Sequence, residues 1–204
     1  MNSLYGSALR WLGWAAAILH LAAVAGFGAA LSGYSQTLHP VALLGAQGFP
    51  HALAFNVLAF VLPGLLMAAV ALGLRHAMPS RSGWHGRVGC QLLLLSALGF
   101  VAMGLLPLDA TDLDNSASRY HATAWMLWWV AFVPGALLLA ASQWAREGVS
   151  RFARLTVALA LSLLAIVLIG VELLPPGVAQ RLAFGLWLAW GGIAAMRTPA
   201  IRAA

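Results

Sequence analysis

Asp109 and His121 are the two side chains in this sequence best suited to acid–base chemistry. A carboxylate beside an imidazole orients the ring and raises its basicity, so such a pair could activate water or a lipid hydroxyl. Asn56 is a third catalytic candidate, as a donor to an oxyanion or to the substrate. No serine or cysteine nucleophile stands out. The structural alternative is that Asp109 caps a helix end or pairs with Arg119.

Four further polar side chains are predicted to contact a ligand: His39, His51, Glu172 and Arg181. A guanidinium matches the geometry of a phosphate, so Arg181 is the predicted contact of a phosphate head group. The alternative is a salt bridge between Glu172 and Arg181 that closes the hairpin of the last two helices.

An aromatic stripe follows His121 at helical spacing and comprises Trp125, Trp128 and Phe132. One interpretation is an aromatic-walled cleft for a lipid, with His121 at its mouth and Trp125 and Trp128 in its wall. The other is an interfacial aromatic belt combined with core packing. Trp125 suits the belt, whereas Trp128 and Phe132 lie too deep for it.

A zinc site would need ligands from three separate segments, because the sequence has no local HxxxH or HExxH motif. No metal site is therefore assigned, and the cofactor stays open. The residues that would have to converge are His39, His51 and His121 with one of Asp109, Asp112 and Asp114.

His20 is the histidine nearest the middle of a membrane span. A lone histidine there is usually neutral and hydrogen-bonded to a neighbouring helix. Haem would need histidine pairs at matching depths, and His20 has no such partner in the sequence. The single Cys90 excludes a disulfide framework.

The composition decides the class of protein that positions these residues. Of the 204 residues, 62% are hydrophobic and 8% are charged, and the mean hydropathy is +0.89. A soluble domain carries roughly 25% charged residues, so this chain is predicted to be an integral membrane protein. Disorder, a coiled coil and nucleic-acid binding are excluded, although the net charge is +6.

Six continuous apolar segments predict an all-α bundle of six transmembrane helices in one domain, residues 1–204. Strands are excluded because the apolar residues do not alternate. The first segment is too long for the apolar part of a signal peptide and is interpreted as an uncleaved span. The spans are about 10–32, 52–75, 87–108, 120–144, 152–174 and 181–197.

The arginines predict the orientation by the positive-inside rule. Only Arg119 and Arg181 fall on the outer side, where most of the acids also lie. Both termini are therefore predicted to be cytoplasmic, in a bacterial inner membrane. The arginines on the cytoplasmic side are Arg10, Arg75, Arg81, Arg87, Arg146, Arg151, Arg154, Arg197 and Arg202.

The second and fourth spans share a motif, AFVLPGLLMAA and AFVPGALLLAA. This similarity indicates either a duplicated hairpin or a chance likeness of two Leu/Ala-rich helices. In either case, Pro63 and Pro134 are predicted to kink their helices and to free a carbonyl group. The outer segment 33–51 is predicted to fold back onto the bundle.

The ordered motifs resemble the membrane family catalogued as domain of unknown function 998. The matching residues are Leu44-Gly45, Asn56, Gly64, Leu106-Pro107-Leu108-Asp109 and His121. The resemblance implies a six-helix bundle with its motifs at the extracytoplasmic side and implies no established activity. The family is also distantly similar to a eukaryotic group that includes proteins remodelling the lipid of GPI anchors.

The polar groups therefore converge on the outer leaflet, and membrane lipids are the predicted partners. The first hypothesis is a cleft that binds a lipid or an amphipathic small molecule and, as an enzyme, hydrolyses or transfers part of it with Asp109 and His121. The second is a non-enzymatic carrier, receptor or assembly factor whose polar cluster is structural. The sequence does not decide between enzyme and binding protein.

Overall fold

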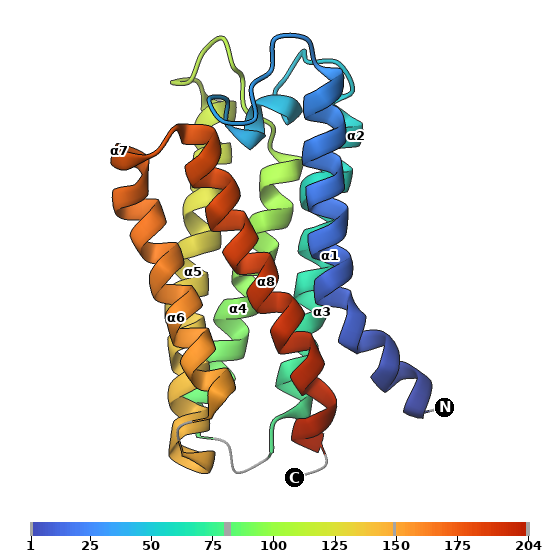
Figure 1. The fold of residues 1–204 in the computed structure, drawn as a ribbon, viewed down its shortest axis with the longest axis vertical. Helices are drawn as coiled ribbons and strands as arrows, with labels where there is room; N and C mark the ends of the chain where they lie inside the picture. Colours follow the sequence, from blue (N-terminus) through green and yellow to red (C-terminus); the bar gives the residue numbers. More distant parts are fainter. Residues whose placement is uncertain (1, 80–82, 149, 203–204) are drawn as a thin grey trace.

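The computed structural model describes residues 2–79, 83–148 and 150–202, and all its regular elements are helices. Figure 1 shows them as one upright bundle with loops across one end. In chain order they are α1 (Asn2–Ala30), the 3₁₀ helix η1 (Val41–Gly45), α2 (Ala52–Asn56), the π-helix η2 (Val57–Val61), α3 (Leu62–Ala77), α4 (Trp84–Leu105), α5 (Ser116–Glu147), α6 (Arg151–Ala165), the π-helix η3 (Ile166–Gly170), α7 (Val171–Leu173) and α8 (Pro176–Arg202).

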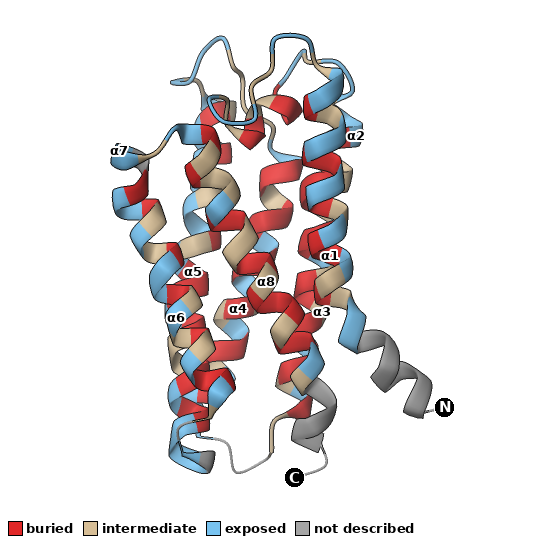
Figure 2. Cartoon of the chain, in the orientation of Figure 1, coloured by how far each residue is buried: buried red, intermediate tan, exposed pale blue. Residues whose placement is uncertain are grey.

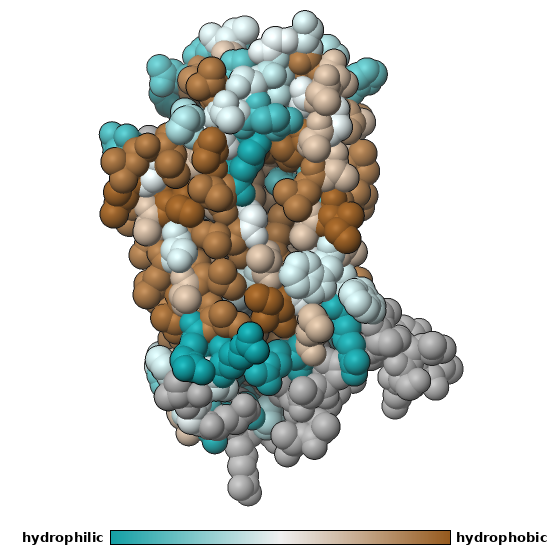
Figure 3. Space-filling view, viewed as in Figure 1, coloured by the Kyte–Doolittle hydropathy of each residue, from teal (hydrophilic) through white to brown (hydrophobic). Residues whose placement is uncertain are grey.

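The prediction of an all-helical, multi-pass membrane protein is confirmed. Within the described residues, the segments long and apolar enough to cross a membrane are Arg10–Ala30, Ala52–Ala77, Trp84–Leu105, Ser116–Arg146 and Arg151–Gly170. The sixth predicted span corresponds to α8, which is longer than expected. Figure 3 shows a wide hydrophobic belt across the middle of the bundle on the face in view.

The helices form a ring in which α1, α3, α4, α5 and α6 are successive neighbours, and α8 closes it. α8 packs against α1, α3 and α6, and it runs across the bundle in Figure 1. The start of α1 and the end of α8 lie at the same end of the bundle. That this end is cytoplasmic stays a prediction. Arg81, one of the arginines on which this prediction rests, lies outside the described residues.

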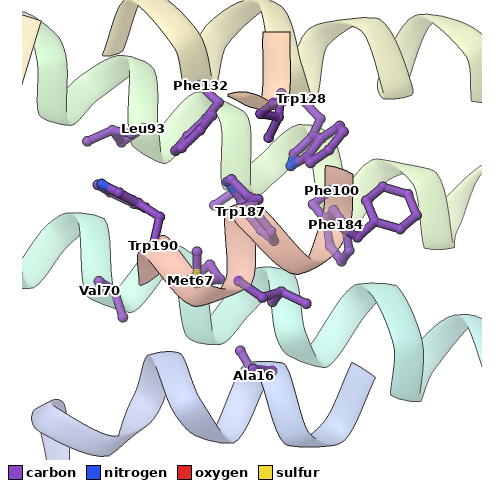
Figure 4. Close-up of a cluster of buried hydrophobic side chains, with 14 of the residues drawn as sticks. Ala16, Met67, Val70, Leu93, Phe100, Trp128, Phe132, Phe184, Trp187 and Trp190 are labelled. Carbon is purple, nitrogen blue, oxygen red and sulfur yellow. The ribbon is translucent and has the colours of Figure 1, made fainter. Parts of the chain in front are cut away.

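Aromatic side chains from three helices fill the centre of the bundle, where Figure 2 is red. Phe100 of α4 stacks on Trp187 of α8, with ring centroids 4.5 Å apart. Trp128 of α5 meets Phe184 of α8 edge-on at 5.0 Å, as the close-up in Figure 4 shows. Rings in such offset or edge-on contacts attract one another beyond their area burial. This cluster ties α4, α5 and α8 together.

A glycine lets α1 and α8 cross at backbone contact. A Cβ at Gly13 of α1 would collide with the backbone of Gly191 in α8. Small residues allow such close approach in membrane bundles, where dispersion and hydrogen bonds replace the hydrophobic effect between helices.

The second span is interrupted at its proline, as predicted. Pro63 has no N–H to donate to the carbonyl oxygen of Ala59, its acceptor in a regular α-helix. The chain instead forms the π-helix η2 just before Pro63. The ring of His20, in α1, reaches the Ala59 carbonyl oxygen with Nδ1 at 2.7 Å. By contrast, α5 continues through Pro134 as an α-helix.

Candidate functional site

The guanidinium of Arg181, near the start of α8, is held by oxygen atoms of the loop between α1 and η1. Its Nε and Nη2 both donate to Oε1 of Gln36, at 3.0 and 2.6 Å. Nη2 also donates to the hydroxyl of Tyr34 at 2.7 Å. Nη1 donates to the carbonyl oxygens of His39 at 3.1 Å and Gly177 at 2.8 Å. The guanidinium N–H groups thus all have partners, and every partner is a neutral oxygen.

Arg181 therefore has no acidic partner among the residues that the structure describes. Glu172 is exposed on the short helix α7, and it forms no ion pair with Arg181. The interpretation of these two residues as a salt bridge is wrong, because the guanidinium is hydrogen-bonded to the loop after α1 instead. The positive charge of Arg181 is hydrogen-bonded but not neutralised.

The loop can approach α8 closely because Gly177 has no side chain. A Cβ at this position would lie 2.6 Å from the carbonyl oxygens of Thr37 and His39. A second hydrogen bond joins the end of this loop to α8: the backbone N–H of Val41 donates to Oε1 of Gln180 at 2.7 Å. The predicted return of this outer segment onto the bundle thus takes place on the start of α8.

Tyr34 packs beside the same cation. The guanidinium carbon of Arg181 lies 5.8 Å from the centre of the Tyr34 ring, in cation–π range. The hydroxyl donates to the carbonyl oxygen of Pro40 at 3.1 Å. Burial raises the pKa of Tyr34 above its ordinary value, and the hydrogen bond and charge of Arg181 oppose that rise.

A cavity of about 760 Å³ lies along α1 beneath this polar cluster. Arg181 and Gln36 line its loop end, His20 lines its deeper end, and apolar residues of α1 such as Leu21 form its wall. Gln36 reaches down α1, where its Nε2 donates to the carbonyl oxygen of Val24 at 3.1 Å. Figure 3 shows hydrophilic side chains descending into the hydrophobic belt on this face.

The structure separates the two predicted ligand-contacting histidines. His39 belongs to the loop around Arg181, and its Nδ1 accepts a hydrogen bond from the backbone N–H of Ser35 at 3.0 Å. His51 has the left-handed backbone conformation, φ 59°, just before α2. It lines a different, apolar cavity of about 380 Å³ with Leu19 and Phe27. The two cavities have no lining residue in common.

Asp109 organises the outer loop between α4 and α5. Its Oδ1 accepts from the backbone N–H and the hydroxyl of Thr111, at 2.9 and 2.6 Å. Its Oδ2 accepts from Nδ2 of Asn115 at 3.0 Å. Asn115 in turn caps α5 by accepting from the backbone N–H of Ser118. The hydrogen bonds from Thr111, then that from Asn115, hold the pKa of Asp109 below its ordinary value.

His121 is bound to a different group. It is buried in the first turns of α5, and its Nδ1 lies 2.9 Å from the carbonyl oxygen of Leu106, to which it donates. No hydrogen bond joins His121 to Asp109 among the residues that the structure describes, and both carboxylate oxygens of Asp109 have other donors. Each side chain instead fastens the segment that follows α4.

Asn56, the third predicted catalytic residue, is buried at the end of α2. Its Nδ2 donates to the carbonyl oxygen of Gly45 at 2.8 Å. A Cβ at Gly45 would collide with the Asn56 amide, so this contact requires glycine. The Leu44-Gly45 motif and the Asn56 motif are therefore two halves of one contact, which holds η1 against α2.

The aromatic stripe of α5 divides between a cavity and the core. Trp125 lines an apolar cavity of about 130 Å³ with Pro40 and Ala183. Trp128 and Phe132 are fully buried. The indole N–H groups of Trp125 and Trp128 are buried, and no group in the described part of the chain accepts a hydrogen bond from them. His121 does not line the cavity at Trp125.

The candidate zinc ligands do not converge. Among the described residues, no group of three or more His, Cys, Asp or Glu side chains is placed to hold a metal ion. His39, His51 and His121 lie in three different environments, as their separate partners show.

Tyr34 and Gln36 are the site residues that sequence reasoning missed. Neither is ionised at neutral pH, so a search for charged groups at membrane depth passes over both. The sequence carries no direct signal for either residue, because their contacts with Arg181 join positions about 145 residues apart.

The fold and these loop contacts define a helical membrane protein whose polar residues gather at one end of the bundle. Residues 14–197 match the model of the family described as protein of unknown function DUF998. The chain therefore belongs to this family, as its motifs indicated. No curated protein and no solved structure matches the chain.

Proposed function

We propose that this protein binds an anionic amphipathic molecule, a lipid with a phosphate or carboxylate group, in the cavity beside α1. Arg181 supplies the positive charge, and the apolar wall of α1 receives the hydrocarbon part. The observation that carries the proposal is the un-neutralised guanidinium at one end of a largely apolar cavity of about 760 Å³.

The arrangement around Gln36 supports an anion at this place. The Nε and Nη2 edge of an arginine is the edge that binds a carboxylate or phosphate with two parallel hydrogen bonds. Here Oε1 of Gln36 accepts both bonds. A neutral amide oxygen therefore stands where an anion oxygen would gain charge attraction as well. An arriving anion takes this edge and displaces the Gln36 amide.

The cavity supports an amphipathic ligand rather than a fully polar one. Its volume falls in the range of about 300–1,000 Å³ that small-molecule sites occupy. Its polar groups are confined to the Arg181 end and to His20, and apolar α1 residues such as Leu21 and Ala25 make up most of its wall. Leu21 is 58% exposed, so the cavity opens toward the surrounding hydrocarbon.

The proposed activity is binding, and a hydrolytic step is not part of it. A His base oriented by Asp would need the carboxylate of Asp109 to reach His121. The carboxylate is committed to Thr111 and Asn115, and His121 Nδ1 donates to a backbone carbonyl. This observation favours a non-enzymatic carrier, receptor or assembly factor.

The proposal can be tested by native mass spectrometry of the purified protein released from nanodiscs of mixed phosphatidylglycerol and phosphatidylcholine. We expect the wild type to retain phosphatidylglycerol in preference. Arg181→Gln should lose this preference, because it removes the charge. Arg119→Gln is the matched control, since Arg119 is exposed near the same end of the bundle and carries the same charge.

A second variant separates binding from folding. Gln36→Glu places a carboxylate on the Nε and Nη2 edge of Arg181 and gives up the hydrogen bond from Nε2 to the carbonyl oxygen of Val24. We expect it to fold, as its thermal stability in detergent reports, and to lose the preference for the anionic lipid. Equal retention of both lipids by the wild type, or equal losses in Arg119→Gln and Arg181→Gln, contradicts the proposal.

A further inference from the structure

His20 lines the deeper end of the cavity and has one ring nitrogen without a partner. Its Nδ1 contacts the carbonyl oxygen of Ala59 at 2.7 Å. No hydrogen bond to Nε2 occurs within the described part of the chain, although the residue is only 2% exposed. His20 is one of the residues that line the cavity, so a molecule bound there can supply the missing donor.

The contact with Ala59 decides which ring nitrogen of His20 carries the proton. A carbonyl oxygen only accepts hydrogen bonds, so Nδ1 carries the hydrogen. The ring is surrounded by Phe60, Phe100 and Phe184, with centroids 6.1, 5.7 and 5.4 Å away. A charged imidazolium among three phenyl rings is costly. His20 is therefore neutral, and Nε2 presents a lone pair that accepts a hydrogen bond.

His20 lies about one helical turn deeper along α1 than the contact between Gln36 and Val24. Gln36 bridges the two levels, because its Oε1 accepts from Arg181 and its Nε2 donates to the carbonyl oxygen of Val24. Val24 and His20 are one helical turn apart, a rise of about 6 Å. A ligand that reaches Arg181 with its anionic group thus has its next few atoms beside His20.

We infer that the ligand of this cavity is a single-chain anionic lipid with a free hydroxyl between its charged group and its hydrocarbon chain. The anionic group lies at Arg181, and the hydroxyl donates to Nε2 of His20. Lipids of the 1-acylglycerol phosphate type have this order of groups. A diacyl lipid carries an ester at the same position and offers no donor. This inference rests on the proposed function and specifies its ligand.

The inference can be tested with three probes that differ only at this position. They are 1-oleoylglycerol 3-phosphate, its 2-deoxy analogue without the hydroxyl, and the matching diacyl phosphatidic acid. Binding to the full chain in neutral detergent is measured by isothermal titration or native mass spectrometry. We expect wild type to bind the hydroxyl-bearing probe about tenfold more tightly than the deoxy analogue, the effect of one well-formed hydrogen bond in a dry site.

Two substitutions at His20 separate its two nitrogens. In His20→Asn, the amide nitrogen stands where Nδ1 stood, so the bond to Ala59 is kept and the deep acceptor is lost. In His20→Gln, the amide oxygen stands where Nε2 stood. We expect His20→Asn to bind both monoacyl probes equally and His20→Gln to keep part of the hydroxyl preference. The thermal stability of each variant in detergent reports whether it is folded.

The outcomes distinguish the inference from the proposal beneath it. If all three phosphates bind equally in an Arg181-dependent way, the proposed function stands and the inference fails. If the hydroxyl preference persists in a folded His20→Asn variant, the inference also fails, and water is the partner of Nε2. If no anionic probe binds more tightly than a zwitterionic lysophosphatidylcholine, the proposed function itself fails.

Discussion

Nδ1 of His20 donates a hydrogen bond to the carbonyl oxygen of Ala59, 2.7 Å away on the neighbouring span. Pro63, one turn further along that span, cannot supply the backbone donor that a regular helix would give this carbonyl. The histidine of α1 therefore compensates for the proline of α3. The pair joins α1 to the π-helix η2 in the hydrophobic part of the bundle.

Replacing His20 by leucine should destabilise the protein by about 1 kcal/mol, because interhelical hydrogen bonds in membranes contribute roughly this much. His20→Asn keeps a donor to Ala59 and should lose less. The free energy of unfolding, obtained by titrating detergent-solubilised protein with sodium dodecyl sulfate, checks both values. Equal losses of unfolding free energy in the two variants would mean that packing of the His20 ring, and not its hydrogen bond, stabilises the protein.

Gly45 and Asn56 should behave as a coupled pair. Gly45→Ala drives a methyl group into the Asn56 amide and should destabilise the protein by about 1–3 kcal/mol, as overpacking does. Asn56→Ala removes the amide and its hydrogen bond. The double variant should therefore be more stable than Gly45→Ala alone. Thermal unfolding of the wild type, the two single variants and the double variant gives a double-mutant cycle. Strictly additive losses of stability would contradict direct contact between Gly45 and Asn56.

Asp109 should make the outer loop between α4 and α5 sensitive to acid. Its pKa is lower in the folded protein than in the unfolded chain, chiefly through Thr111. The ionised carboxylate therefore stabilises the loop above its unfolded pKa, and this contribution is lost as pH falls through the folded pKa. Carboxyl carbon shifts in a ¹³C NMR titration measure the value.

Thr111→Val is the matching substitution, because it removes the hydroxyl donor and leaves the backbone donor of residue 111 in place. It should move the pKa of Asp109 upward, toward the ordinary carboxyl value. Thr123→Val serves as the control, since the Thr123 hydroxyl donates to the carbonyl oxygen of Arg119 and not to Asp109. An unchanged Asp109 titration in Thr111→Val would refute the stated cause of the shift.

Two glycines of α1 should respond in opposite ways to alanine. Gly13→Ala pushes a methyl group against the backbone of Gly191 and should cost about 1–3 kcal/mol by separating α1 from α8. Gly26→Ala meets no atom within 4 Å, and alanine favours the helix, so stability should be unchanged or raised. Unfolding free energies in detergent give both numbers. Comparable losses at the two positions would argue against a close α1–α8 crossing.

Removing the charge of Arg181 should change the titration of Tyr34. The hydrogen bond and the charge of Arg181 both lower the pKa of this phenol, against a larger rise from burial. Arg181→Gln should therefore raise the pKa of Tyr34 further. The phenolate absorbance near 295 nm, as a difference between each protein and its Tyr34→Phe counterpart, isolates this residue. A lower pKa in Arg181→Gln would contradict the observed contact.

The helices were predictable because each depends on its own segment. An apolar run of about 20 residues in a membrane has to satisfy its backbone internally, and a helix does so without help from the rest of the chain. The end of α3 near Arg75 and the positions of α4 and α5 follow from this rule within a few residues. The interruption at Pro63 was likewise predictable, because the missing N–H is a property of one residue.

The candidate site was predictable only in its parts. Arg181 and His39 were selected by residue type, and both belong to the cluster at the start of α8. The pairing of Asp109 with His121 was inferred from shared depth, yet each binds its own loop partners. Depth in the membrane can be read from hydropathy, but the direction of a side chain around its helix depends on the neighbours it packs against.

By itself, the sequence determined the protein class, the helical spans, the asymmetry of the arginines and the proline that breaks the second span. These features depend on composition and on backbone groups within one segment. Only the tertiary structure decided that Gln36 meets Arg181, 145 positions later in the chain, and that His20 meets Ala59. Such contacts depend on how helices rotate and cross, which close glycine contacts and aromatic packing set after the helices have formed.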